Sequence, residues 1–400
     1  MGCASATEDM MGFRTRLWCL SVTIAPFLAV TVVYLIARIW ALRGFAHTIT
    51  PLPLSSVLFT IPSVLLRYLR MIVWPRGLSC YYDTPYIRAP SLGGLGVSLL
   101  LLAGVAGALA FWFRKLRKDS RAQAKTVAFL AFWTVLAVMP VLNFRLLPEG
   151  EIVHDRYAYL PMVGFVILAA LGLRQAGASL GRCFPRPIWG LTGMGALAVL
   201  MAIATARQSL YWSDDLTLYH RAHEVAPRNL SATTSLAAAA AERGMEGAAV
   251  ALYRQALAVE PDFWRANVNL GYLLYARGDF AGAAPHFQRA CAANPWDGDQ
   301  FLYLGMSLLR LGRPGEAERA VRSALLVRPN GDSYHLGLGM VLLQEEKLIE
   351  AKQELESELA RNPSCAQASA LLAEVNRRLV TAAQGDNTMH SPMAGPRHVK

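Results

Sequence analysis

The chain has 400 residues, enough for two or three domains, and 54% of them are apolar whereas only 17% are charged. This composition excludes a protein that is soluble throughout, so part of the chain is expected to lie in a membrane. The formal net charge of +11 comes with no nucleic-acid-binding motif, and its basic residues stand beside apolar stretches, so nucleic acid is not an expected partner.

The first half of the chain contains apolar segments long enough to cross a bilayer, whose hydrocarbon core is about 30 Å thick. A membrane domain over residues 1–211, with about five or six spans, is therefore expected. One segment, residues 57–74, contains Pro62, Arg67 and Arg70, so it either crosses the membrane or lies in its interface. The other expected spans are residues 17–40, 92–113, 126–147, 159–173 and 188–206.

A basic run directly after the expected span 92–113 sets the expected orientation of the chain in the membrane. It opposes a single acidic residue, Asp119, and by the positive-inside rule it marks a cytoplasmic loop. Because spans alternate, the loop 148–159 and everything after residue 206 are expected on the periplasmic or lumenal side. The basic residues are Arg114, Lys115, Arg117, Lys118, Arg121 and Lys125.

The expected outer loop carries a polar motif at the entry to the next span. It comprises His154, Asp155, Arg156, Tyr157 and Tyr159, and ionisable groups at such a place are costly unless they bind something or one another. An arginine fork suits a phosphate oxygen, and tyrosines can stack on a sugar or pack a polyprenyl chain. These residues form a candidate lipid-phosphate and sugar site. The alternative is interfacial anchoring by an aromatic belt and an Asp–Arg pair.

The soluble part is expected to begin at Trp212, directly after the last span. Ser213 is predicted to cap a helix whose first turn holds Asp214 and Asp215, because acidic side chains are stabilised at a helix N-terminus. A catalytic role for the two aspartates is the alternative. Six cysteines are scattered without metal-ligand spacing, so neither a zinc site nor a disulfide framework is indicated.

The second half repeats itself every 34 residues. Small residues recur where helices would cross, and glycine recurs where the chain would reverse. Proline recurs between the units, at Pro227, Pro261, Pro295, Pro329 and Pro363. These motifs resemble the tetratricopeptide repeat (TPR) family, in which paired antiparallel helices stack because one pair cannot bury its own apolar face.

The period divides the second half as follows. Residues 212–383 are predicted to form a TPR domain with a half repeat over 216–227, four full repeats and a capping helix over 367–382. Residues 384–400 are predicted to be a disordered tail. The predicted fold class is all-α, with an incomplete multispanning membrane bundle followed by an α-solenoid.

The resemblance to TPR proteins implies a peptide-binding groove along one face of the first helix of each repeat. That face is largely apolar, so it suits an extended or helical peptide with large side chains. The alternative is that some of these residues face the core of the superhelix or bind lipid headgroups. The groove residues are Arg265, Val268, Tyr272, Tyr275, Leu302, Met306, Leu309, Leu336, Met340 and Leu343.

The membrane half carries a second resemblance. The run from His154 to Pro161, the segment 67–82 and the following repeats are similar to the transmembrane and tetratricopeptide repeat-containing (TMTC) proteins, which resemble GT-C glycosyltransferases. The resemblance implies transfer of a sugar from a polyprenyl-phosphate carrier to acceptor proteins on the external or lumenal face. Beyond that lipid-linked donor no cofactor is expected, and a need for a divalent metal is left open.

In that family the catalytic acidic residues lie in the first external loop, and no counterpart of this loop is recognised in the sequence. No catalytic residue is therefore assigned. Two hypotheses follow: an enzyme, or the C-terminal portion of one, whose repeats hold acceptor proteins beside the membrane, and a non-catalytic membrane scaffold. A channel or transporter has little support, because no inverted repeat is present and few polar residues lie within the spans.

The orientation can be measured directly. We expect a periplasmic reporter fused after Pro363 to be active, because the basic run places the repeats outside the cytoplasm. Activity of a cytoplasmic reporter alone at the same position would contradict the predicted sidedness. The sequon Asn229-Leu-Ser231 suggests a parallel test by glycosylation in a eukaryotic host.

Overall fold

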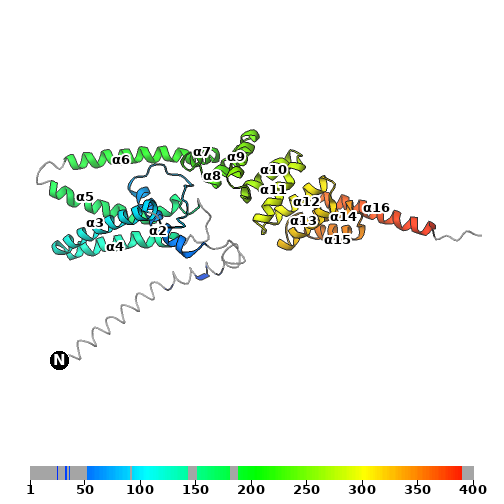
Figure 1. Ribbon diagram of the computed structural model, residues 1–400, viewed down its shortest axis with the longest axis horizontal. Coiled ribbons are helices and arrows are strands. Elements are labelled where there is room, and N and C mark those ends of the chain that lie inside the picture. Colours follow the sequence, from blue (N-terminus) through cyan, green and yellow to red (C-terminus); the bar gives the residue numbers. More distant parts are fainter. Residues whose placement is uncertain are drawn as a thin grey trace, which may run out of the picture.

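The computed structural model describes residues 52–90, 92–142, 151–180 and 188–389, together with residues 25, 32, 33 and 36. All regular elements in this part of the chain are helices (Figure 1), which confirms the all-α prediction. The expected span 17–40 lies outside the described residues apart from the four single positions.

Five long helices and four short ones make up the described part of the N-terminal half. Helices α3, α4 and α5 lie side by side (Figure 1) and enclose a small cluster around Leu116, Leu130 and Leu168. The elements are α2 (Leu54–Val73), η1 (Leu92–Gly96), α3 (Val97–Asp119), α4 (Arg121–Val138), η2 (Met139–Leu142), η3 (Asp155–Ala158), α5 (Tyr159–Leu180), α6 (Ile188–Ser209) and η4 (Leu210–Trp212).

Three stretches of the described chain are long and apolar enough to cross a membrane: Leu54–Val73, Leu92–Asp119 and Asp155–Gln175. They coincide with three of the expected spans. Their outer surfaces carry large apolar side chains that no other part of the structure covers, such as Leu100 at 73% exposure and Phe111 at 72%. Contact of such side chains with water is unfavourable in free energy, whereas contact with the hydrocarbon of a bilayer is not.

The structure corrects the extent of several expected spans. The basic run is not a loop, because α3 continues to Asp119 and α4 begins at Arg121, so Ser120 alone separates the two helices. Helix α4 ends at Val138, and a 3-10 turn follows over Met139–Leu142, in which Pro140 has no N–H to donate to the helix. The remainder of this expected span, to residue 147, lies outside the described residues. Helix α5 outlasts its expected end at residue 173.

The C-terminal half is a row of antiparallel helix pairs that extends away from the bundle (Figure 1). Helix α7 (Asp215–Val225) is the predicted half repeat, and α16 (Ala366–Met389) is the capping helix. The four full repeats are α8 (Leu230–Glu242) with α9 (Glu246–Val259), α10 (Trp264–Ala276) with α11 (Phe280–Ala293), α12 (Gly298–Arg310) with α13 (Pro314–Val327), and α14 (Tyr334–Gln344) with α15 (Leu348–Arg361).

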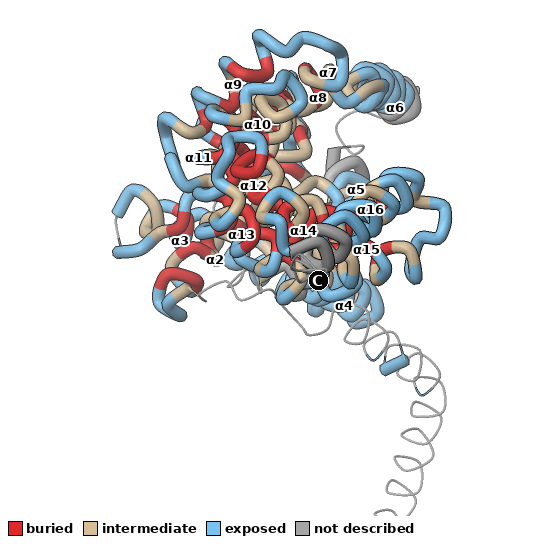
Figure 2. Tube along the Cα trace, turned by 90° about the vertical axis from the view of Figure 1, so that its right-hand side faces the viewer, coloured by how far each residue is buried: buried red, intermediate tan, exposed pale blue. Residues whose placement is uncertain are grey.

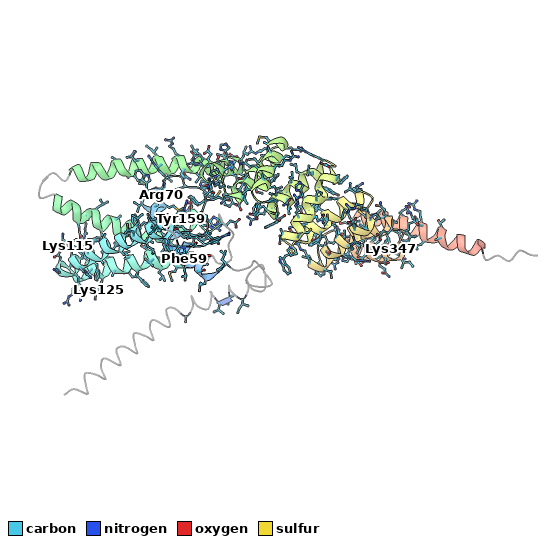
Figure 3. All side chains as sticks on the ribbon, in the orientation of Figure 1. Phe59, Arg70, Lys115, Lys125, Tyr159 and Lys347 are labelled. Carbon is cyan, nitrogen blue, oxygen red and sulfur yellow. The ribbon has the colours of Figure 1, made fainter. Side chains whose placement is uncertain are left out.

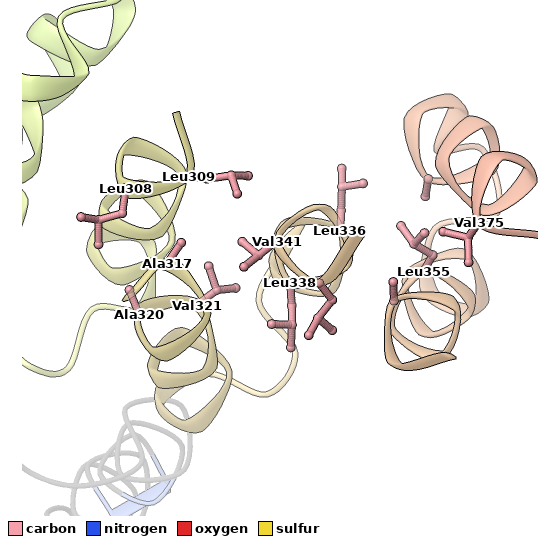
Figure 4. Close-up of a cluster of buried hydrophobic side chains, with 13 residues drawn as sticks. Leu308, Leu309, Ala317, Ala320, Val321, Leu336, Leu338, Val341, Leu355 and Val375 are labelled. Carbon is pink, nitrogen blue, oxygen red and sulfur yellow. The ribbon is translucent and has the colours of Figure 1, made fainter. Parts of the chain in front are cut away.

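The core of this array repeats with the sequence period. Ala249, Ala283, Ala317 and Ala351 occupy the same place in α9, α11, α13 and α15, and each is 0% exposed. Buried positions run through the inside of the whole array (Figure 2). At its C-terminal end, leucines and valines from α12 to α16 form one continuous cluster (Figure 4). The repeats therefore bury their apolar faces against one another, as solenoids do.

The turns inside the repeats share a left-handed backbone. Gly244, Gly278 and Gly312 have φ of 76°, 78° and 71°, and the equivalent residue of the fourth repeat, Glu346, has φ of 58°. Glycine adopts this conformation freely, whereas a residue with a Cβ atom pays about 1 kcal/mol. The fourth repeat therefore keeps the turn at an energetic cost.

The capping helix differs from its prediction at the C-terminal end. It continues past the expected end near residue 382 as far as Met389, so the first residues of the predicted tail are helical. Its buried residues Ala368 and Val375 join the cluster formed by α14 and α15. The rest of the tail, residues 390–400, lies outside the described residues.

The strained turn predicts a stabilising substitution. Glu346→Gly should raise the stability of the array by about 1 kcal/mol, because it removes the Cβ from a left-handed residue. Gly312→Ala at the equivalent position should lower it by a similar amount. Urea unfolding of the purified chain measures both changes, and equal midpoints for wild type and Glu346→Gly would contradict this account of the turn.

Candidate functional site

The predicted polar motif lies where the N-terminal half meets the first TPR repeat. Two connecting segments of the N-terminal half, residues 78–83 and 151–157, come together there with the start of α8 and with Arg265 of α10. We call this region the junction. It joins residues that are far apart in the sequence and therefore fixes the array to the apolar helices.

Tyr82 is the centre of the junction. Its hydroxyl donates a hydrogen bond to Asp155 and accepts one from the Ser79 N–H, with a nitrogen–oxygen distance of 2.9 Å. Burial and the bond to Asp155 raise the pKa of this hydroxyl, so it stays protonated and remains a donor. Asp155 is thus held by a tyrosine rather than by the neighbouring Arg156.

His154 is oriented by three groups. Its backbone N–H donates to the Tyr68 hydroxyl at 3.3 Å, and its Nδ1 lies 3.1 Å from the Cys80 carbonyl oxygen. Its ring packs edge-on against Tyr157, with 5.6 Å between ring centroids. An imidazole held at Nδ1 by a carbonyl carries its proton on that nitrogen when neutral, which leaves Nε2 as an acceptor.

The remaining residues of the motif are more accessible. Arg156 is exposed, and its guanidinium lies 5.1 Å from the centroid of the half-buried Tyr157 ring. Tyr159 is 66% exposed and lies near the end of the bundle that faces the array (Figure 3). The structure therefore brings His154, Asp155 and Tyr157 together and leaves Arg156 and Tyr159 facing outward.

A polar cluster joins the outer segment to the array. The Glu151 carboxylate accepts hydrogen bonds from the Ser231 hydroxyl, at 2.8 Å, and from the Arg265 guanidinium. The Arg265 guanidinium also donates to the Ser231 oxygen at 3.2 Å. Arg265 was predicted to line a peptide groove. In the structure it pairs with Glu151 of the N-terminal half instead.

Asn229 supports the junction from the array side. Its side-chain oxygen accepts from the Ala232 N–H at 2.9 Å and caps α8, while its amide nitrogen donates to the Tyr82 carbonyl at 3.1 Å. The side chain is buried at 5% exposure. A sugar would be attached to the amide nitrogen that donates to Tyr82, so glycosylation of this sequon requires the chain to be modified before the junction forms.

The two aspartates after η4 lie at the start of α7. Asp214, not Ser213, is the N-cap of α7, and its carboxylate accepts from the Thr217 N–H at 3.1 Å. Ser213 was predicted as the cap, but its hydroxyl instead donates to Asp214 at 3.3 Å. A carboxylate at this position is stabilised by the helix dipole.

The predicted groove residues divide into two sets. Val268, Leu309 and Leu336 are buried, at 6%, 7% and 9% exposure, and pack inside the array. The half-buried remainder includes an aromatic group in which Tyr303, a residue not predicted, lies between Tyr272 and Tyr275 at centroid distances of 4.6 and 5.2 Å. The other half-buried members are Leu302, Met306, Met340 and Leu343.

A hollow of about 510 Å³ lies on the other side of α12. Its walls come from α11, α12 and α13, with Leu304 and Leu308 at the apolar floor and Arg313, Glu316 and Arg319 at the rim. By helical periodicity these leucines point away from Leu302 and Met306. This hollow was not predicted from the sequence. The small residues Ala281, Ala284 and Ala320 on the facing helices could have indicated space between them.

Comparison with known proteins identifies the repeats. Residues 236–297 and residues 274–341 match the tetratricopeptide repeat family. YrrB, a TPR protein with an unusual peptide-binding site, is 22% identical with a TM-score of 0.38, over 40% of this chain and 82% of that one. The second TPR domain of human RPAP3, solved with an HSP70 peptide, is 24% identical with a TM-score of 0.27, over 28% and 92%.

A third solved structure, MamA from Desulfovibrio magneticus, is 17% identical with a TM-score of 0.36, over 42% of this chain and 96% of that one. No curated protein matches the chain. The chain therefore contains tetratricopeptide repeats, and the matches extend over the array alone.

The junction predicts a measurable coupling. Glu151→Ala and Arg265→Ala should each loosen the contact, because either change leaves a partly buried charge without its partner. The double variant should cost less than the sum of the two, with a coupling of about 1 kcal/mol. Amide hydrogen exchange at residues 78–83 and 229–235 reports the opening.

The exposed Glu246–Arg277 pair, 2.7 Å apart within the array, provides the control. Glu246→Ala should leave exchange at residues 78–83 unchanged. If Glu151→Ala behaves in the same way, the carboxylate does not hold the junction.

Proposed function

We propose that this chain is an integral membrane protein that uses its TPR array to hold a partner protein close to the outer face of the membrane. The observation that carries the proposal is the junction: Asn229 and Arg265 of the array bond to Tyr82 and Glu151 of the segments that connect the apolar helices. An array attached in this way keeps whatever it binds next to the membrane half.

Membrane insertion is supported by the exposed apolar surfaces of α3 and α4 and by the three stretches long enough to span a bilayer. The orientation, with the array on the periplasmic or lumenal side, rests on the basic residues at the α3–α4 turn. The membrane lipid is then one partner of the chain and the protein held by the array is the other.

The contact surface for the partner is the half-buried aromatic and methionine face of α10, α12 and α14. Tyr303 contacts both Tyr272 and Tyr275 edge to face, so the three rings present a rigid apolar surface. Met306 and Met340 continue it toward α14, and methionine adapts to side chains of different shape. This surface favours a peptide segment with large apolar side chains.

A second candidate function is sugar transfer from a polyprenyl-phosphate carrier to the bound protein. It is favoured by Arg156: among the described residues its guanidinium has no carboxylate partner, since Asp155 bonds to Tyr82. Of the interfacial-anchoring alternative, the aromatic belt is present, whereas Asp155 bonds to Tyr82 and not to Arg156. An unpaired guanidinium beside tyrosine rings suits a phosphate group and an adjoining sugar or prenyl chain.

Peptide binding can be tested with a displayed peptide library selected on the full chain in detergent. Each of the substitutions Tyr272→Ala and Met340→Ala should raise the Kd of the selected peptides by at least about tenfold, which corresponds to about 1.4 kcal/mol of binding free energy. Arg319→Ala, at the rim of the hollow on the other side of α12, is the matched control. Loss of binding in the control alone would place the peptide in that hollow.

Lipid binding at the junction is tested separately. Arg156→Ala should weaken binding of a polyprenyl-phosphate sugar about tenfold, because a charge-assisted bond to phosphate is lost. Arg76→Ala, which removes another guanidinium stacked on an aromatic ring, at 5.2 Å from Trp74, is the control. Equal affinity for Arg156→Ala and wild type would remove this residue from the site.

A further inference from the structure

The α3–α4 turn forms a second, strongly basic site at the end of the bundle remote from the array. It is a hollow of about 660 Å³ between the last turns of α3 and the first turn of α4. Lys115 and Lys125 mark this end of the molecule, far from Lys347 in the array (Figure 3). The hollow is lined by Phe111, Arg114, Lys115, Arg117, Lys118 and Arg121.

The charge in this hollow is not balanced by the protein. Within the described part of the chain, none of the five basic residues forms an ion pair, and the neighbouring Asp119 forms none with them. Like charges held this close repel one another, and an anion bound among them would relieve that repulsion.

The walls of the hollow are held in place by side chains. The Trp112 indole N–H donates to Gln175 of α5 at 2.8 Å, and Gln175 donates to Gln123 of α4 at 3.3 Å. Leu116 is buried at 3% exposure in the cluster between the helices. Because α3, α4 and α5 are tied together at this level, the basic side chains converge without reorganising the backbone.

The start of α4 adds to the positive potential. Its first turn contains no acidic residue, and Ser120 caps only the Gln123 N–H, at 3.4 Å. The other N–H groups of that turn point toward the same end of the bundle as Arg121. A helix N-terminus of this kind favours a phosphate group.

The apolar part of the hollow indicates what kind of phosphate it holds. Phe111 is 72% exposed and lies one helical turn before Lys115, in the second half of the stretch Leu92–Asp119 that is long enough to span a bilayer. A ligand here meets cations on one side and an apolar surface on the other. We propose that the hollow binds the phosphate headgroup of an anionic phospholipid, with the acyl chains along Phe111 and α3.

This inference rests on the proposed membrane insertion, and its test separates the two. Purified full chain in detergent is titrated with phosphatidylglycerol or phosphatidylcholine, and bound lipid is counted by native mass spectrometry. Wild type should retain phosphatidylglycerol in preference to phosphatidylcholine. The variant Arg117→Gln/Lys118→Gln/Arg121→Gln should lose that preference at least tenfold.

The control variant removes the same charge elsewhere. Arg254, Arg289 and Arg319 are exposed on the array, and Arg254→Gln/Arg289→Gln/Arg319→Gln should keep the preference of wild type. Equal loss in both variants, or none in the first, overturns the site. Competition by soluble glycerol phosphate as effective as by the lipid also overturns it, since a free phosphate would then suffice.

Carbonate extraction of cell membranes is the separate measure of insertion. If wild type is extracted as a peripheral protein, the proposed function fails. If it stays in the membrane while the first variant still prefers phosphatidylglycerol, the headgroup site alone fails.

Discussion

The whole array depends on how closely two helices can approach within one repeat. The closest contact between the paired helices is occupied in each repeat by a fully buried alanine: Ala249, Ala283, Ala317 and Ala351. A larger side chain there would push the paired helices apart and shift every later repeat relative to the junction. The position of the face proposed to bind a peptide therefore follows from four small side chains, none of which needs to touch a ligand.

Much of this arrangement could be predicted from the sequence, because it rests on local rules applied several times. Glycine at Gly244, Gly278 and Gly312 marks left-handed turns, and the 34-residue period locates the helix pairs. The fourth repeat departs from the repeat pattern at residue 358, and the structure explains how the departure is tolerated. Glu358 replaces the alanine of the other repeats and is buried, but its carboxylate accepts a hydrogen bond from the Leu336 N–H at 3.3 Å, which satisfies it.

The junction could not be predicted in the same way. Tyr82 with Asp155, and Glu151 with Arg265, are pairs that become neighbours only when segments far apart in sequence have folded. The sequence indicated that residues of the motif at 154–159 bind something or one another, and the structure shows an internal partner for one of them. Asp155 is satisfied internally, whereas Arg156 is exposed. The cap of α7 shows the same limit on a smaller scale, because Ser213 and Asp214 are adjacent and only backbone geometry decides between them.

The first repeat is attached at the junction and each later repeat contacts only its neighbours. Each repeat therefore lies at its own fixed distance from the junction. The four repeats of the array extend from the bundle in one direction (Figure 1). The repeat that a protein segment engages would then set how far from the apolar helices that segment is held. Gain or loss of one 34-residue unit would change this distance in a discrete step while leaving the attachment at Asn229 and Arg265 intact.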